Sequence, residues 1–398
     1  MSNLRSRRQV LRPGQVRGAN SAVVLKLLRQ RQRLSRAEIA RSTGLSEGTI
    51  SRITAGLLER GLVIEEGAEN STGGRPAIRL RLDDQRQLSI GVDILNWETR
   101  IAVGTISGTV LEMNCLRTPA TPAATLDLIA RQIKELRNRY RHASLIGVGV
   151  TARGLVNSDT GVVELGSEPG WERIPVREEM ERAIGMPVRV ENDVRAAALA
   201  EFEHGNAEVQ SSHCLLFLKI GEGAGLGIVL DGQLYRGRHL AAGEIGQMIL
   251  SSNERSIRHD SPDCVEKLIA NPAICERYSR LAGNRHRTSA GDSTAQVKRI
   301  CHLALEGDRV ARQTLSETAR LLGVAITNAV WMLDADTVII DGAITDAWHE
   351  VSSAIRAQFP VGDQFPNFRR LLLRPSSLAG SATMLAALSL SFDHLFAQ

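Results

Sequence analysis

The sequence predicts an α/β protein that carries a winged helix-turn-helix near its N-terminal end. Three observations support this prediction. Residues 35–52 contain helix start and stop signals in the order of a helix-turn-helix, and excess positive charge is confined to residues 1–82. From Leu88 onward, short β-branched apolar runs alternate with helical segments. The 398 residues, 43% of them hydrophobic and 23% charged, suffice for two or three globular domains.

The helix-turn-helix is predicted by the order of its capping signals. Ser35 and Glu38 form a capping box, residues 43–44 (Thr-Gly) end that helix, and Ser46 can cap the next one. In the second helix the apolar side chains keep helical spacing at Ile50, Ile53 and Leu57. This leaves the leading end of that helix free, which is the end that normally enters the major groove.

The residue types at this leading end suit DNA. Ser and Thr can donate to phosphates or base edges, and Arg can bind guanine through two hydrogen bonds. An ordinary solvated helix is the alternative. From these two helices we expect DNA contacts by Arg36, Ser46, Thr49, Ser51 and Arg52.

A two-stranded wing is predicted after these helices. Apolar residues 62–64 lead into an acidic turn, and residues 77–82 alternate loosely between apolar side chains and arginines. The Gly-Gly-Arg-Pro segment at 73–76 could bring backbone close to DNA and place Arg75 in a narrow minor groove. The alternative interpretation of this segment is a loop that precedes a linker.

Charge is divided unevenly along the chain. Residues 1–82 hold 16 Lys and Arg against 6 Asp and Glu, a balance of +10, whereas the other 33 basic and 38 acidic residues give −5. Phosphate binding by counterion release favours such concentrated positive charge. We therefore expect double-stranded DNA as a partner.

The sequence shows no sign of a membrane-spanning or secreted protein. The best apolar run, residues 214–230, is broken by Lys219 and Glu222, and the Arg-rich N-terminus lacks the apolar core of a secretory signal. The five cysteines show no Cys-x-x-Cys spacing, so we expect reduced, mainly buried thiols in a cytoplasmic protein.

Several motifs recur in the order typical of one family. They are Arg17–Asn20, Ser35–Arg52, Gly73–Pro76, Gly170–Trp171, Glu191–Asp193, the glycines between Gly221 and Gly227, Ala242–Gly246 and Cys264–Glu266. Over nearly the entire chain, this order resembles that of the ROK family, named for repressors, open reading frames and sugar kinases. The resemblance implies a ribonuclease-H-like fold, also called actin-like or sugar-kinase-like, with two lobes around a cleft. Members with an N-terminal winged helix look like sugar-responsive transcription factors.

The domain boundaries follow from this resemblance. We expect residues 1–82 to form the winged helix-turn-helix with its wing and linker, and residues 83–193 to form the first lobe. Residues 194–380 would form the second lobe, with sugar-site and dimerisation elements, and the C-terminal helix 381–398 would join the first lobe.

The predicted sugar site lies after a strand at residues 186–190. Asn192 and Asp193 follow this strand, and ligands of α/β sheets collect beyond such strand ends. By resemblance Asn192 contacts the sugar and Asp193 matches the general base of the kinases, while Glu244 and Glu266 complete the set. Gln247 replaces a sugar-contacting His of the family. Without the resemblance, residues 192–193 would be interpreted as a helix N-cap and the glutamates as surface charge.

The sequence departs from the family at the phosphate site. ROK kinases place an Asp, two glycines, a Thr and often a Lys after the first strand. Here Asp93 is followed by Ile94, Leu95, Asn96, Trp97 and Glu98, so bulky side chains and an acid oppose phosphate binding. We therefore expect no kinase activity. The glycine-rich loop 221–227 matches the family and could serve either as a phosphate cradle or in tight lobe packing.

The family's zinc motif is also degenerate. Many ROK proteins hold structural zinc through one His and three Cys. The matching positions here are Gln247, Ile257, His259 and Cys264, which leaves at most two good ligands. We expect neither zinc nor another cofactor.

These inferences combine into one hypothesis. The chain would be a homodimeric transcriptional regulator, able to pair into tetramers and most commonly a repressor of carbohydrate uptake or catabolism genes. A sugar or sugar derivative in the cleft would change lobe closure and hence the spacing of two winged helices. The alternatives are a ROK-type sugar kinase with a fused DNA-binding domain, and a repressor controlled by a protein partner with a vestigial cleft.

Overall fold

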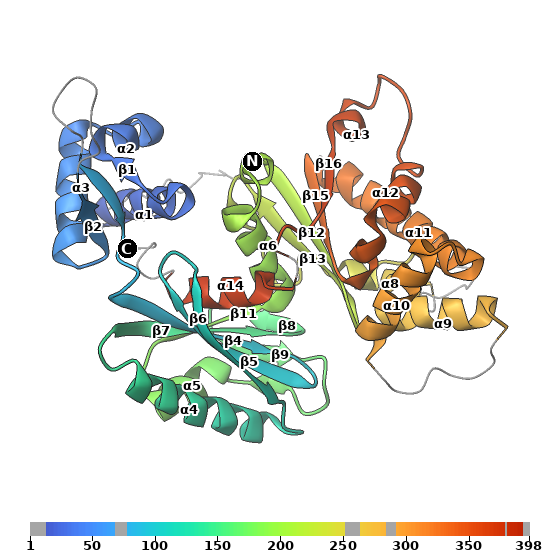
Figure 1. The fold of residues 1–398 in the computed structure, drawn as a ribbon, viewed down its shortest axis with the longest axis horizontal. Helices are drawn as coiled ribbons and strands as arrows, with labels where there is room; N and C mark the ends of the chain where they lie inside the picture. Colours follow the sequence, from blue (N-terminus) through green and yellow to red (C-terminus); the bar gives the residue numbers. More distant parts are fainter. Residues whose placement is uncertain (1–12, 68–77, 251–262, 284–291, 379, 393–398) are drawn as a thin grey trace, which may run out of the picture.

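A small N-terminal domain packs against a two-lobed body in the protein (Figure 1). The structure is a computed structural model that describes residues 13–67, 78–250, 263–283, 292–378 and 380–392. Within these ranges, no helix has both the length and the apolar character needed to cross a membrane. The α/β architecture predicted from the sequence is confirmed.

The N-terminal domain contains the predicted helix-turn-helix. Its elements are α1 (Pro13–Arg31), β1 (Leu34–Ser35), α2 (Arg36–Thr43), α3 (Glu47–Glu59), β2 (Val63–Glu66) and β3 (Arg79–Leu82). Ser35 and Glu38 form the capping box of α2, which ends at Gly44 with a φ of 70°, and Ser46 caps α3. The first helix begins at Pro13, earlier than the motif at residue 17 suggested, because proline is tolerated in the first helical turn.

The wing strands β2 and β3 pair antiparallel, and β1 pairs with the other edge of β3. Hydrophobic side chains from α1, α2, α3 and these strands form the core of the domain, with Leu25, Ile39, Ile50 and Leu80 fully buried. The Gly73–Pro76 segment, including Arg75, lies outside the described residues.

Each lobe is built on a five-stranded sheet of the same design. The first sheet has the order β11-β7-β4-β5-β6, and the second has the order β14-β13-β12-β15-β16. In each sheet, three strands that are consecutive in sequence pair antiparallel. A later strand then pairs parallel with the first of these three, and one more strand pairs parallel with that one. This repetition confirms the ribonuclease-H-like fold with two lobes.

The first lobe and its connections contain β4 (Gln87–Ile94), β5 (Glu98–Thr105), β6 (Val110–Arg117), α4 (Pro122–Arg139), β7 (Ser144–Ala152), α5 (Val176–Ile184) and β11 (Val188–Asn192). A small sheet of β8 (Leu155–Asn157), β9 (Val162–Leu165) and β10 (Glu172–Ile174) adjoins it. Helices α4 and α5 pack together on one face of the large sheet (Figure 1). Strand β11 begins two residues later than the predicted strand and runs to Asn192.

The second lobe contains the remaining strands and most of the remaining helices. The strands are β12 (Cys214–Ile220), β13 (Ala224–Leu230), β14 (Gln233–Leu234), β15 (Thr337–Asp341) and β16 (Leu372–Pro375). The helices are α6 (Asp193–His204), α7 (Ala207–Gln210), η1 (Ile245–Gln247), α8 (Val265–Ile269), α9 (Asn271–Leu281), α10 (Ser293–Leu305), α11 (Arg309–Leu333), η2 (Ala343–Ala347), α12 (Trp348–Arg356) and α13 (Pro366–Arg370).

The C-terminal helix α14 (Ala382–Leu390) returns to the first lobe and packs between its sheet and α6 (Figure 1). A Cβ placed on Gly149 of β7 would lie 1.9 Å from the backbone oxygen of Ala387, so only glycine permits this approach. Asp93 of β4 is bound from the same helix, because Thr383 donates its hydroxyl to the Asp93 carboxylate at 2.8 Å.

All five cysteines are free thiols, and four of them are buried. Burial raises the pKa of Cys214 and Cys275 to about 11 and that of Cys301 to about 12. Cys115, on β6, is exposed.

The N-terminal domain is attached to the body through α1. Arg29 donates to the Ser389 hydroxyl of α14 at 2.6 Å, and Arg29 and Lys26 each lie 3.7 Å from the Glu203 carboxylate near the end of α6. Ile106 and Phe392, both fully buried, extend the apolar core of the domain into the first lobe.

His204, at the end of α6, makes this joint sensitive to acid. Its Nε2 is buried without a hydrogen-bond partner among the described residues. Desolvation, followed by the positive charge of Arg29, lowers its pKa from 6.5 to about 3. A histidine whose pKa is depressed in the folded state binds more protons when unfolded, so stability falls as pH drops below 6.5.

We predict that lowering the pH from about 7.5 to about 5 costs about 2 kcal/mol of unfolding free energy through His204 alone. Urea denaturation of wild type and His204→Gln at both pH values measures this contribution. His349→Gln, at an exposed histidine, is the control and should retain the wild-type pH dependence. Equal acid sensitivity of wild type and His204→Gln would contradict the assignment.

Candidate functional site

The leading end of α3 presents a polar surface. Ser46, Ser51 and Arg52 are exposed, and the half-buried Thr49 shares a hydrogen bond with the Ser46 hydroxyl at 2.9 Å. Among the residues that the structure describes, Arg52 has a single hydrogen bond, which its Nε donates to the Gly48 carbonyl of its own helix at 3.3 Å. These four side chains therefore lie together at the helix end proposed to face DNA.

Arg36 lies in a different environment from the other predicted DNA contacts. Its Nε donates to the Thr54 hydroxyl of α3 at 3.1 Å, and its Nη2 donates to Glu65 of β2 at 2.7 Å. The side chain thus connects α2, the recognition helix and the wing. Sequence reasoning missed this role because Glu65 lies 29 residues away and no local pattern pairs the two.

Asn192 closes the start of α6. Its Oδ1 accepts from the backbone amides of Val194 and Arg195 at 3.0 and 2.9 Å, and its Nδ2 donates to the Gly154 carbonyl at 3.0 Å. The N-cap geometry that residue type alone suggested is therefore present. The bond to Gly154 also joins α6 to the turn that follows β7.

Asp193, at the start of α6, is neutralised by a lysine of β12. Its Oδ2 lies 2.9 Å from the Lys219 ammonium of β12. Burial by itself would lower the pKa of Lys219, but Asp193 and Asp93 outweigh it and raise that pKa. Sequence reasoning treated Lys219 only as a break in an apolar run, since neither carboxylate is near it in sequence.

Two further carboxylates surround the same lysine. Asp93 is fully buried, and burial raises its pKa despite the charge of Lys219 and hydrogen bonds from the Thr151 and Thr383 hydroxyls. Asp341 is the register partner of Lys219 on β15, and burial likewise raises its pKa. One cation thus balances carboxylates from both lobes.

Glu244 lies close enough to both Asp193 and Glu266 for their charges to act on its carboxylate. Glu244 is exposed, yet protein atoms crowd its carboxylate, so desolvation, with the charges of Glu266 and Asp193, raises its pKa against the opposing effect of Arg195. Glu266 accepts from the Ala224 amide at 3.2 Å. The structure therefore brings these three predicted sugar-site carboxylates together.

The glycine-rich loop packs tightly against its surroundings. A Cβ on Gly223 would lie 2.7 Å from the Glu266 Oε2, and one on Gly227 would lie 2.3 Å from the Ala198 Cβ. Close packing accounts for both glycines without a phosphate. Gln247 is exposed at the end of η1, where its backbone N–H donates to the Glu244 carbonyl.

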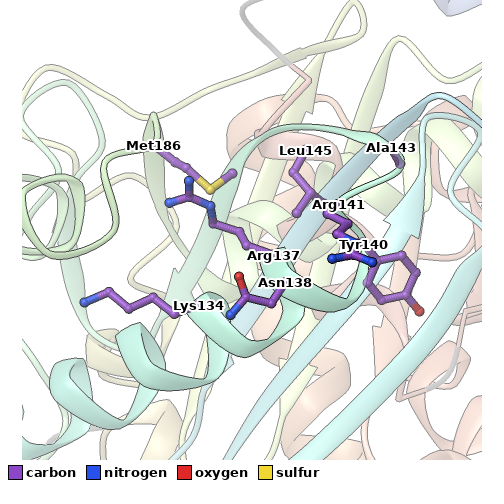
Figure 2. A pocket seen from close by; sticks show the side chains of 8 residues that line it. All are labelled: Lys134, Arg137, Asn138, Tyr140, Arg141, Ala143, Leu145 and Met186. Atoms are coloured by element: carbon purple, nitrogen blue, oxygen red, sulfur yellow. The ribbon is translucent and has the colours of Figure 1, made fainter.

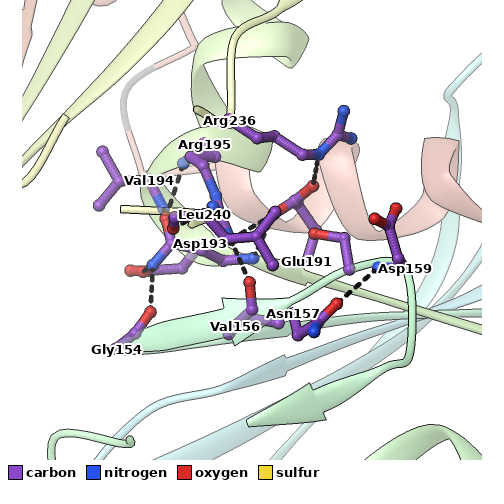
Figure 3. Close-up of polar contacts among 12 residues, drawn as sticks. Gly154, Val156, Asn157, Asp159, Glu191, Asp193, Val194, Arg195, Arg236 and Leu240 are labelled. Carbon is purple, nitrogen blue, oxygen red and sulfur yellow. Dashed lines mark hydrogen bonds and ion pairs between the residues drawn. The ribbon is translucent and has the colours of Figure 1, made fainter. Parts of the chain in front are cut away.

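A buried charge network fixes the first turn of α6 (Figure 3). Glu191 accepts from Arg195 at 2.9 Å and from Arg236 at 2.8 Å. Arg195 also donates to the carbonyls of Val156 and Leu240 at 2.7 Å each. This network, which the sequence reasoning missed, ties the loop near residue 240 to β8 and to the helix that carries Asp193.

Of the four degenerate zinc positions, Gln247 and Cys264 lie within the described residues. Cys264 is buried and forms a backbone bridge with Ile249, whereas His259 lies outside the described ranges. Within those ranges, no three His, Cys, Asp or Glu side chains are grouped so that they could hold a metal ion.

Two cavities of about 640 Å³ each open on the first lobe. One, lined by residues including Lys134, Arg137 and Leu145, lies at the amino end of β7 (Figure 2). The other lies at the carboxyl end of β7 beside Arg153. Only the second is at the sheet edge where α/β proteins collect ligands.

Comparison with known proteins gives consistent matches. A family model described as ROK family matches residues 89–392, and one described as the IclR helix-turn-helix domain matches residues 19–67. The chain is 27% identical to the xylose repressor of Caldicellulosiruptor bescii over 331 residues, covering 81% of this chain and 82% of that protein. It is 29% identical over 337 residues to the N-acetylglucosamine repressor of Escherichia coli O6:H1, and this match covers 83% of this chain and 82% of that protein.

A solved structure also matches. The structure of a ROK family transcriptional regulator, a homolog of the E. coli MLC protein, superposes on this chain with a TM-score of 0.79 at 24% identity. That match covers 96% of this chain and 97% of the other, and it shows the shared fold.

We predict that Lys219→Met destabilises the protein by about 2–3 kcal/mol, because Asp193 would lose its buried counter-ion. This value is below the range of about 3–5 kcal/mol for breaking a fully buried pair, because the Lys219 side chain keeps 24% of its surface exposed. Chemical denaturation measures the loss. In a double-mutant cycle, adding Asp193→Asn should recover part of it, whereas additive losses would contradict the pairing.

Proposed function

We propose, because the chain belongs to the ROK family, that it is a sugar-responsive DNA-binding transcriptional regulator whose usual action is repression of carbohydrate uptake or catabolism genes. The relatives named above are repressors named for xylose and N-acetylglucosamine. Their names support both DNA as a partner and a sugar as the effector. The helix-turn-helix and the exposed polar end of α3 support the DNA contact.

The observation that carries this proposal is the position of α6. Its N-terminal end holds Asn192 and Asp193, two residues of the proposed sugar site. Near its C-terminal end Glu203 faces Lys26 and Arg29 of the DNA-binding domain. A helix of 12 residues is about 18 Å long, so one rigid element links the two sites.

Ligand binding would act through this helix. A sugar hydroxyl hydrogen-bonded to Asp193 would compete with Lys219 for the same carboxylate and so favour a different placement of the lobes. In a homodimer the two recognition helices must reach half-sites about 34 Å apart, so a small rotation of α1 with α6 would prevent simultaneous docking. The bound sugar would then relieve repression.

The sugar-kinase alternative is less well supported by the geometry. Asp193, which would have to accept a proton from the substrate hydroxyl, is held in an ion pair with Lys219. The turn from β4 to β5 carries Leu95, Asn96 and Trp97 in place of glycines. We propose a regulator without phosphoryl transfer, for which sugar-dependent ATP hydrolysis should be absent.

The proposal is tested by fluorescence anisotropy of the full chain on its own upstream DNA at fixed salt. A panel of sugars, amino sugars and sugar phosphates is titrated into the complex. A several-fold affinity shift with one compound is expected. Tight DNA binding that no compound alters would instead favour control by a protein partner.

For the DNA contact, we predict that Arg52→Ala weakens operator binding by about 1–3 kcal/mol, because the guanidinium at the leading end of α3 would contact a base or phosphate. The matched control is Arg60→Ala, which removes the same charge from the opposite end of the helix. Equal losses for both variants would indicate only general charge attraction.

For the coupling, we predict that Glu203→Gln leaves sugar affinity and sugar-free DNA affinity within about twofold but abolishes most of the sugar-induced shift. The neutral side chain would no longer attract Lys26 and Arg29. Glu208→Gln is the control, because Glu208 is exposed and faces Arg374 instead of α1. An unchanged sugar response in Glu203→Gln would show that α6 does not carry the signal.

A further inference from the structure

The cavity at the carboxyl end of β7 has the size and composition of a ligand site. Its volume of about 640 Å³ lies within the range of about 300–1,000 Å³ common for small-molecule pockets. Apolar and aromatic side chains alternate with a few polar groups around it, including Leu95, Trp97, Arg117, Arg153, Glu168 and Trp171.

This cavity adjoins the proposed sugar residues. Arg153 lies on the turn between β7 and β8, and the next residue, Gly154, accepts the hydrogen bond from Asn192. On the other side, a Cβ built on Gly223 would be 3.8 Å from the Arg153 Nη2 and 2.7 Å from the Glu266 Oε2. Arg153 therefore stands between the cavity and the group of carboxylates.

Three side chains of the lining are available to a ligand. The indole of Trp97 is 78% exposed although it borders a cavity. Arg117 is exposed, and within the described ranges the Arg153 side chain donates to the Asn96 side chain alone, at 2.5 Å. No carboxylate of the described residues forms an ion pair with either arginine.

These features match the chemistry of a sugar ring. An exposed indole offers a flat apolar face against which the C–H face of a pyranose can lie, while arginine donors can bind its hydroxyls. A ring held by the carboxylates would lie on the Glu266 side of Arg153, whereas Trp97 and Arg117 line the cavity together with Arg153. A second ring linked to the first would reach them past Arg153.

We propose that this cavity is a second sugar-ring subsite and that the effector is a disaccharide instead of a monosaccharide. One ring would occupy the carboxylate group, and the other would stack on Trp97 and receive hydrogen bonds from Arg153 and Arg117. This inference rests on the proposed function, since it names the class of effector for the same cleft.

The test is calorimetric titration of the full chain with three matched pairs: xylose and xylobiose, N-acetylglucosamine and N,N′-diacetylchitobiose, glucose and cellobiose. We expect that in at least one pair the disaccharide binds tenfold or more tightly than the monosaccharide. Trp97→Ala should remove this excess and leave monosaccharide affinity unchanged, whereas Trp97→Phe, which keeps an aromatic face, should retain part of it. Because Trp97 is exposed, its truncation should leave the melting temperature near that of wild type.

The outcomes separate this inference from the proposed function. Monosaccharides that bind and shift DNA affinity, with no disaccharide excess in wild type, would overturn the second subsite alone. Equal losses of both ligands in Trp97→Ala would overturn it as well. If neither member of any pair binds and DNA affinity never shifts, the sugar-responsive function fails together with the inference.

Discussion

The structure depends on one lysine that neutralises a cluster of carboxylates where the two lobes meet. Asp93 arrives from the first sheet, Asp193 from the start of α6 and Asp341 from the second sheet, and Lys219 is the cation common to all three. Without it, like charges would oppose the contact of β4, α6 and β12. The two hydroxyls that bind Asp93, from Thr151 and Thr383, add the C-terminal helix to the same junction. The same charges and hydrogen bonds therefore hold the two lobes together, fix α14 against the first sheet and position Asp193.

Local patterns were enough to predict the N-terminal domain and the start of α6. The helix caps in this domain form between residues at most four positions apart, so the sequence alone predicts them. They are the capping box at Ser35, the left-handed Gly44 and the cap at Ser46. The same is true of Asn192, whose cap predicts the end of β11 and the first turn of the next helix. The resemblance to ROK proteins supplied the two-lobed arrangement, which no local pattern contains.

The long-range contacts could not be predicted from the sequence. Lys219 and Asp193, Arg36 and Glu65, and Arg195 with the carbonyls of Val156 and Leu240 pair across 26 to 45 residues. Each pairing exists only because the sheets bring the strand ends together. Arg36 illustrates the consequence: the sequence suggested a DNA contact for it, and the bonds of its guanidinium to Thr54 and Glu65 could not be predicted. The Arg36 side chain thereby joins α2 to α3 and to the wing strand β2.

The distribution of thiols has a practical meaning for following this molecule in solution. Cys214, Cys264, Cys275 and Cys301 are enclosed by protein, whereas Cys115 stands exposed on the outermost strand of the first sheet. A maleimide dye added to the native protein would therefore attach at one position without any engineering. Because β6 lies at the opposite edge of the sheet from the strand that carries Asn192, the dye would lie away from Asn192 and report on rotation of the first lobe relative to bound DNA.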